Sequence, residues 1–144
     1  MDAHLYNVDI SWKSGRTGEM TSPELTTAVE VATPPQFPNG VEGIWSPEHL
    51  FTAAVASCLM TTFLAIAENS KLEFTDFQCG SNGKLEQIEG KFLMTEVILE
   101  PTVVIINEED REKAERVLQK SEANCLISNS VHSKITMIPN IVVG

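Results

Sequence analysis

The chain has 144 residues, of which 42% are hydrophobic and 21% are charged, and its formal net charge is −10. This size and composition predict a single globular domain spanning residues 1–144. The acidic balance argues against nucleic-acid binding, which needs Lys and Arg side chains to neutralise phosphates. Residues 1–10 lack the apolar run of a signal peptide, so we expect a cytoplasmic protein whose three cysteines are free thiols rather than a disulfide framework.

Before residue 44 the chain reads as extended segments joined by turns. A strand is expected at His4–Trp12, followed by the turn Lys13–Gly18 with Arg16 at its tip. A second extended run covers Glu19–Ala32. The next segment, Thr33–Gly43, is rich in proline and glycine and is expected to be irregular.

Ser46–Asn69 carries the clearest helix signal in the chain. Ser46 is a good N-cap, Pro47 suits the first helical position, and Glu48 lies where the helix dipole favours an acid. No residue from Leu50 to Ala67 is charged, and apolar side chains occur on nearly every face. We therefore expect this helix to be buried nearly all round.

Two other interpretations of this helix stay open at this point. Leu50–Ala67 reaches the lower length limit for a membrane span, but its hydroxyl side chains and the absence of basic flanks argue against a membrane protein. The segment is also compatible with a plain core helix in which Cys58 is an inert thiol, because free cysteine is among the most buried residue types.

The second half of the chain alternates between strands and a helix. Strands are expected at Lys71–Cys79 and Lys84–Ile106, with turns at Asn82–Gly83 and Ile88–Gly90. The remaining expected elements are a surface helix at Glu108–Ala123 capped by Asn107, a short helical turn at Cys125–Ser130, and a strand at Ile135–Val143 interrupted by Pro139. This order of elements predicts an α+β fold.

The cysteines are the best candidates for chemistry. The three histidines are scattered without ligand spacing, so we expect no metal site and no cofactor. Cys79 ends a strand and is read as a spectator. Cys58 is in mid-helix and gains little from the helix dipole, whereas Cys125 is expected at the start of a helical turn, which favours it as the more reactive thiol. The other arginines lie in the surface helix, where we expect them to pair with acids, and Arg16 is left to enter a site.

Glu48 raises a geometric question about that site. On one continuous helix it lies ten residues before Cys58, a separation of about 15 Å. If both residues belong to one site, the helices of two subunits must pack antiparallel, with Glu48 of one near Cys58 of the other. This arrangement predicts a homodimer with shared sites.

Three motifs of the chain, in the right order, resemble the OsmC/Ohr family of osmotically inducible and organic hydroperoxide resistance proteins. Ser46–Cys58 (SPEHLFTAAVASC) is similar to the family signature of a Pro-Glu pair followed by a cysteine ten residues after the Glu. Cys125–Asn129 (CLISN) is similar to the second cysteine motif, and Gly15–Gly18 (GRTG) to the turn of the organic hydroperoxide branch. The order of strands and helices also matches, so the resemblance covers essentially the whole chain.

The resemblance implies both a fold and an activity. The implied fold is an α+β fold with antiparallel sheets around a long buried central helix, assembled as an intertwined homodimer. The implied activity is that of a thiol-dependent peroxidase acting on organic hydroperoxides. By matching position, Cys58 would be the peroxidatic cysteine and Cys125 the resolving one, while Arg16 would hold the thiolate and Glu48 would orient Arg16. These roles reverse the preference for Cys125, and we follow them.

The resemblance also implies the partners of the site. An apolar wall of Phe51, Val55, Leu50 and Trp45 would favour organic hydroperoxides over hydrogen peroxide, and a dithiol of lipoyl type would restore the thiols by exchange.

The chain departs from many relatives in having Leu126, where they have proline, directly after the second cysteine. The segment Thr33–Gly43 looks more like that of OsmC-like members than that of the organic hydroperoxide branch.

Two rival functions remain. One is a module that binds a small ligand or lipid and keeps the thiols for redox sensing, and it predicts a reactive Cys58 without rapid turnover. The other is a purely structural dimer with inert thiols. Neither rival needs Cys58, Cys125 and Arg16 together, which is why the peroxidase is preferred.

Overall fold

The computed structural model describes residues 1–144. The chain forms two compact units, Met1–Leu50 and Phe51–Gly144, which are described separately below. The elements are β1 (Asp9–Ser14), β2 (Thr17–Thr21), β3 (Val29–Ala32), α1 (Pro47–Asn69), β4 (Phe74–Ile88), β5 (Lys91–Ile105), η1 (Glu108–Asp110), α2 (Arg111–Ala123), η2 (Ser128–Ser130), β6 (Lys134–Met137) and β7 (Asn140–Val143). This order confirms the α+β class, while a single domain stays a prediction.

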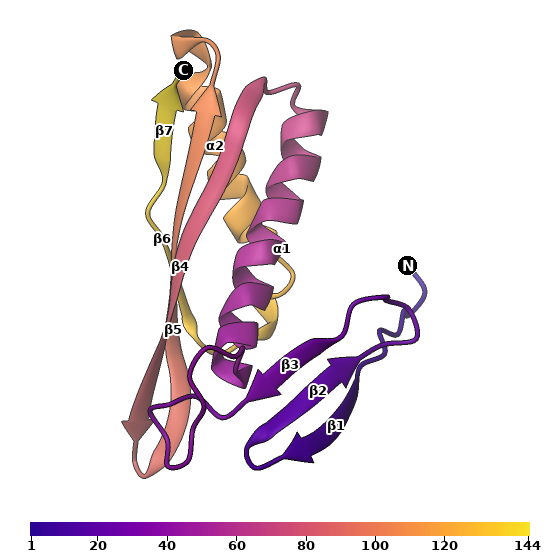
Figure 1. Cartoon of the computed structure of the whole chain (residues 1–144). Helices are drawn as coiled ribbons and strands as arrows, with labels where there is room; N and C mark the ends of the chain where they lie inside the picture. Colours follow the sequence, from indigo (N-terminus) through magenta and orange to yellow (C-terminus); the bar gives the residue numbers. More distant parts are fainter. The chain divides into compact units, whose positions relative to one another are not determined.

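The first unit is built on a three-stranded antiparallel sheet in the order β1-β2-β3 (Figure 1). Gly15 and Arg16 alone connect β1 to β2, and Gly15 has a φ of +53°, a left-handed value that favours glycine. The Trp12 indole N–H donates a hydrogen bond of 3.0 Å to the Gly15 carbonyl. This bond fixes the turn that carries Arg16.

The strand boundaries in this unit differ from the sequence prediction. The first strand begins at Asp9 rather than at His4, because its partner strand ends at Thr21, which pairs with Asp9. The run Glu19–Ala32 is split into two strands, since Pro23 follows the end of β2 and cannot continue a sheet ladder. The irregular segment Thr33–Gly43 is confirmed, since it holds no helix or strand.

The second unit contains a four-stranded sheet with β5 at its centre. β4 pairs with β5 antiparallel along its whole length, and β6 and β7 follow one another along the other side of β5, both parallel to it (Figure 1). The expectation of purely antiparallel sheets is therefore wrong for this sheet. The reason is that α2 and η2 carry the chain back to the start of β5, as a parallel pairing requires.

α1 begins at Pro47 and ends at Asn69, as the capping pattern predicts. Its N-cap is Ser46, whose hydroxyl accepts a hydrogen bond of 3.1 Å from the His49 backbone N–H. Within the second unit, α1 and α2 cover the same face of the sheet, and Phe63 of α1 lies in the larger hydrophobic cluster with Leu118 of α2 and Val103 of β5.

The opposite face of α1 is open, so the prediction of a helix buried nearly all round is wrong for the single chain. Met60 is 40% exposed and Leu64 is 42% exposed, and Ser57, Thr61 and Ala65 on the same side are also exposed. The sheet and α2 cover only one face of the helix, and nothing else in the second unit reaches the other. α1 is also the one helix long and apolar enough to cross a membrane, a property that the core helices of many proteins share.

The turn expected at Asn82–Gly83 does not exist, whereas the turn at Ile88–Gly90 does. Gly83 lies inside β4, and the chain reverses at Glu89 and Gly90, whose φ values are +50° and +79°. Gly83 is needed for a close approach, because a Cβ at this position would collide with the Thr52 side chain of α1 and would lie 2.7 Å from the Met94 Cε. Asn82–Gly83, which resembles a turn signal in the sequence, thus lies where β4 contacts α1.

Gly83→Ala should therefore lower the free energy of unfolding by about 1–3 kcal/mol, which is typical of overpacking a tight contact. Gly80→Ala is the matched control in the same strand, since a Cβ there meets nothing within 4 Å. Urea denaturation of both variants measures the difference. Equal stability of the two would show that Gly83 is not a packing requirement.

The surface helix is shorter than expected. A 3₁₀ turn at Glu108–Asp110 precedes α2, and the Asn107 side chain makes no capping hydrogen bond. Arg111 pairs with the acid Glu108 in a two-bond contact of 2.8 and 2.9 Å, as expected for an arginine of this helix. The break at Pro139 is confirmed, because it separates β6 from β7.

Candidate active site

The fold of the second unit brings Cys58 and Cys125 together. Cys58 comes from the middle of α1, and Cys125 lies between the end of α2 and η2. The Cys125 thiol lies close enough to the Cys58 sulfur to stabilise its charge, and no disulfide joins the two. Cys58 is 8% exposed and Cys125 is 1% exposed, so Cys58 is the more accessible sulfur of the pair.

The surroundings of Cys58 favour its thiolate. Burial raises the pKa of Cys58, but four hydrogen-bond donors together hold that pKa below its usual value. The donors are the Cys125 thiol, the Ile127 N–H, the Thr62 hydroxyl and the Leu126 N–H. The Thr62 Oγ1 lies 3.9 Å from the Cys58 Sγ. A thiolate is the nucleophilic form of cysteine, so these contacts favour Cys58 as the candidate nucleophile of the pair.

The surroundings of Cys125 act in the opposite direction. Burial raises the pKa of Cys125 and so does the neighbouring Cys58, while contacts from the Ser128 hydroxyl and N–H lower it without reversing the shift. These pKa shifts favour Cys58, against the preference for Cys125 that its position in the sequence gives, and which thiol reacts first stays a prediction. Cys125 does begin a helical turn, in which the Asn129 N–H donates to the Cys125 carbonyl, but the Leu126 and Ile127 N–H groups of that turn point at Cys58.

Thr62→Val removes one of the donors to Cys58 and keeps the shape of the side chain. We expect the pKa of Cys58 to rise, so that less thiolate is present at neutral pH. The alkylation rate of Cys58 by iodoacetamide at pH 7 should fall about threefold, as expected for one hydrogen bond. Mass spectrometry across a pH series follows the rate for this one cysteine. Thr61→Val is the control, because the Thr61 hydroxyl donates to the Cys58 carbonyl instead of its sulfur. An alkylation rate that falls equally in both variants would contradict the role of Thr62 as a donor to the Cys58 sulfur.

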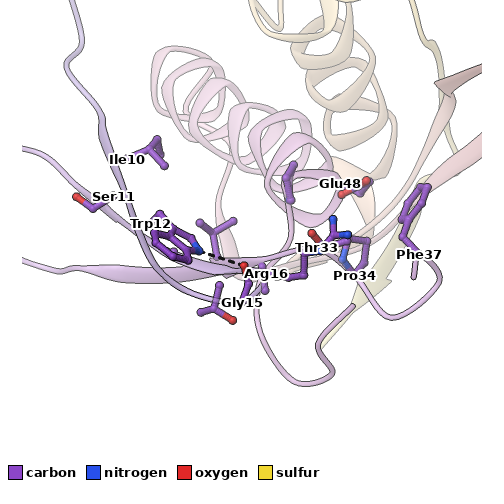
Figure 2. Close-up of a pocket in the computed structure, with 14 residues that line it drawn as sticks. Ile10, Ser11, Trp12, Gly15, Arg16, Thr33, Pro34, Phe37 and Glu48 are labelled. Atoms are coloured by element: carbon purple, nitrogen blue, oxygen red, sulfur yellow. Dashed lines mark hydrogen bonds between the residues drawn. The ribbon is translucent and has the colours of Figure 1, made fainter. Parts of the chain in front are cut away.

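Arg16 and Glu48 line a common pocket in the first unit (Figure 2). The pocket encloses about 510 Å³, and Arg16 and Glu48 are its charged residues. Trp12, Phe37 and Pro34 supply apolar surface around them. A pocket of this size with apolar walls and a few polar groups is typical of sites for small organic ligands.

The residues predicted to form an apolar wall are scattered. Val55 is fully buried in the smaller hydrophobic cluster of the second unit, and Phe51 packs against that cluster. Trp45 is half exposed and contacts the His49 ring edge-on, and neither Trp45 nor Leu50 lines the pocket of the first unit. A role for these four residues in substrate binding stays a prediction.

Cys79 and the histidines stand apart from this chemistry. The Cys79 thiol contacts the Gly80 carbonyl at 3.5 Å, and burial raises the pKa of Cys79. A raised pKa disfavours the reactive thiolate, and the role of Cys79 as a spectator stays a prediction. No group of three or more His, Cys, Asp or Glu residues is arranged to hold a metal ion.

Sequence reasoning missed two parts of these sites. The backbone donors Leu126 and Ile127 leave no signal in the sequence, because any residue carries an N–H. Trp12 and Phe37 line the pocket of the first unit, and the presence of Trp12 next to the Gly15–Gly18 turn is the one signal that pointed there.

The Cys58 and Cys125 thiols thus lie between a long helix and the turn after a second helix of an α+β fold. The family model described as OsmC-like protein matches residues 40–139. The chain therefore belongs to the OsmC-like family, as the three motifs predicted. Among curated proteins, the uncharacterized protein YmaD of Bacillus subtilis is 28% identical over 141 residues, which cover 94% of this chain and 91% of that protein.

Solved structures share the fold over nearly the whole chain. An OsmC-like protein of unknown function from Vibrio cholerae superposes with a TM-score of 0.85 at 23% identity, covering 95% of this chain and 99% of that one. An organic hydroperoxide resistance protein from Legionella pneumophila gives 0.75 at 23% identity, covering 97% and 99%. The organic hydroperoxide resistance protein OhrB of Bacillus subtilis gives 0.68 at 22% identity, covering 96% and 99%. At these identities the likeness concerns the fold.

Proposed function

We propose that this protein is a thiol-dependent peroxidase that reduces organic hydroperoxides to alcohols. The observation that carries the proposal is the contact between Cys58 and Cys125, in which the pKa of Cys58 lies below its usual value despite burial and the pKa of Cys125 lies above it. Such a difference supports Cys58 as the nucleophile and Cys125 as its partner. Membership of a family that includes organic hydroperoxide resistance proteins supports the same activity.

The proposed reaction has three steps. The Cys58 thiolate attacks the O–O bond of the hydroperoxide, and one oxygen stays on the sulfur as sulfenic acid while the other leaves as an alkoxide that takes up a proton. Cys125 then attacks the sulfenic sulfur, an S–S bond forms, and the hydroxyl leaves as water. A dithiol, in our proposal one of lipoyl type, reduces the disulfide by exchange and becomes oxidised itself.

Arg16 and Glu48 are proposed to complete the site. Arg16 would hold the Cys58 thiolate and polarise the peroxide, and Glu48 would orient Arg16. Their position in one pocket with Trp12 and Phe37 supports a substrate with an apolar body. Phe51, Val55, Leu50 and Trp45 are proposed to add apolar contacts on the substrate side of the thiol.

A second copy of the chain is proposed to bring these groups together. Glu48 lies ten residues before Cys58 on α1, a separation of about 15 Å along the helix, so the partner's helix would supply it. The exposed Met60 and Leu64 on the open face of α1 give such a homodimer an apolar contact surface. Sedimentation should show a dimer, and a fully active monomer would remove the shared site. We place the protein in the cytoplasm, where its thiols stay reduced.

Stopped-flow mixing of the reduced protein with cumene hydroperoxide tests the activity. The rate constant should exceed that of free cysteine by several orders of magnitude and should also exceed the rate with hydrogen peroxide, because the pocket walls are apolar. A slow reaction no better than that of a free thiol would refute the peroxidase. The pocket of about 510 Å³ would then favour the second candidate, a module that binds a small apolar ligand and senses redox state.

A further inference from the structure

Ser128 is a buried residue whose side chain has no evident structural purpose. It begins η2, three residues after Cys125, and is 8% exposed. Its Oγ is buried and completes no hydrogen bond of regular geometry, but its hydroxyl lies against the Cys125 thiol. A buried hydroxyl that has lost water without gaining a full partner is destabilising, so its presence calls for a functional reason.

The turn after Cys125 is held together without Ser128. The Asn129 backbone N–H donates to the Cys125 carbonyl at 3.0 Å, and the Asn129 side-chain amide donates to the Ala123 carbonyl at 3.2 Å. The Ser130 hydroxyl donates to the Leu126 carbonyl at 2.7 Å. Because these three bonds fix the turn, the Ser128 hydroxyl is left to act on the thiol beside it.

We propose that Ser128 stabilises the Cys125 thiolate whenever this sulfur carries negative charge during the redox cycle. The inference rests on the proposed function, because it assigns a role within the cycle of Cys58 and Cys125. The two groups beside the Cys125 sulfur are the Ser128 backbone N–H and the Ser128 hydroxyl, and the hydroxyl, which has no other partner, is free to turn its proton toward a charged sulfur. Both groups lower the pKa of Cys125, whereas its burial and the neighbouring Cys58 raise that pKa.

Cys125 carries this charge in two steps. When the disulfide forms, Cys125 loses its proton and its thiolate attacks the Cys58 sulfenic acid, the S–O bond breaks, and the hydroxyl leaves with the proton as water. When the disulfide is reduced, a thiolate of the dithiol attacks the Cys58 sulfur, the S–S bond breaks, and Cys125 leaves as a thiolate. Each step places a full charge on a sulfur that is 1% exposed, where a single charge-assisted hydrogen bond has a large effect.

The test uses the whole protein and does not depend on peroxide. The Cys58–Cys125 disulfide is formed with diamide, and its reduction by dithiothreitol is followed by mass spectrometry. Ser128→Ala should slow this reduction about tenfold, as expected for a hydrogen bond to a charged group. Ser128→Thr keeps the hydroxyl and should restore most of the rate. Ser130→Ala, two residues along the same turn, should stay within about twofold of the parent rate.

A second measurement separates this role from a structural one. In a Cys58→Ala background, Ser128→Ala should raise the pH at which Cys125 becomes reactive toward iodoacetamide. The melting temperature of Ser128→Ala should be unchanged or higher, because the substitution removes a buried hydroxyl that lacks a full hydrogen-bond partner. Unchanged reduction and alkylation rates would overturn the proposal. A lower melting temperature with equal losses in Ser128→Ala and Ser128→Thr would also overturn it, since it would indicate packing. If the protein fails to consume hydroperoxide but Ser128→Ala still slows reduction, only the peroxidase proposal fails.

Discussion

Cys58→Ser should reduce the reaction with an organic hydroperoxide about a thousandfold or more, which is typical for loss of a nucleophile. A serine hydroxyl does not attack the O–O bond at neutral pH, and no other thiol in the chain has both the donors and the exposure of Cys58. Cys125→Ser should behave differently. It should react once per subunit and stop at the sulfenic acid, because a serine hydroxyl does not form a disulfide but can still donate to Cys58.

Trapping with dimedone distinguishes these states. Cys125→Ser should yield a stable dimedone adduct on Cys58 after one equivalent of hydroperoxide, whereas the parent protein should yield almost none. Cys79→Ser is the control variant, since its thiol contacts the Gly80 carbonyl and lies apart from the Cys58–Cys125 pair, and it should leave the rate unchanged. A peroxide reaction that survived in Cys58→Ser and vanished in Cys79→Ser would refute the proposed nucleophile.

Arg16→Ala should slow the oxidation of Cys58 about a hundredfold. The expectation follows from the loss of the positive charge that is proposed to hold the thiolate and to stabilise the charge that develops on the peroxide oxygen. Arg16→Lys should recover only part of the rate, because a lysine ammonium does not reproduce the planar fork of guanidinium donors. Rapid mixing with cumene hydroperoxide measures all three proteins.

The control for the charge itself is Arg116→Ala, which removes an exposed arginine of α2. It should react at the parent rate if the effect of Arg16 is local. An unchanged rate in Arg16→Ala would remove Arg16 from the mechanism. A loss of equal size in Arg116→Ala would show that net charge, not a placed guanidinium, controls the reaction.

The features predicted correctly from the sequence are those set by neighbouring residues. α1 begins after Ser46 and Pro47, which cap and start a helix, and the prediction of its bounds needed nothing else. The Gly15–Arg16 turn and the break at Pro139 follow in the same way from the backbone preferences of glycine and proline.

The features predicted wrongly depend on residues that meet only in the fold. Gly83 reads as a turn residue, but it serves the contact with Thr52, which lies on another element. The lowered pKa of Cys58 depends in part on the N–H groups of Leu126 and Ile127, which have no side-chain signature and lie far along the chain, so the spacing of the cysteines alone favoured Cys125. The open face of α1 differs from the prediction because composition reports how apolar a helix is and not which of its faces the same chain covers.

The most direct test is a disulfide map after one equivalent of cumene hydroperoxide has reacted with the reduced protein. We predict a Cys58–Cys125 bond in every subunit, formed as fast as the peroxide is consumed and reversed by a dithiol. A bond that includes Cys79, or a peroxide consumed without any disulfide, would contradict the pairing on which the proposed mechanism rests.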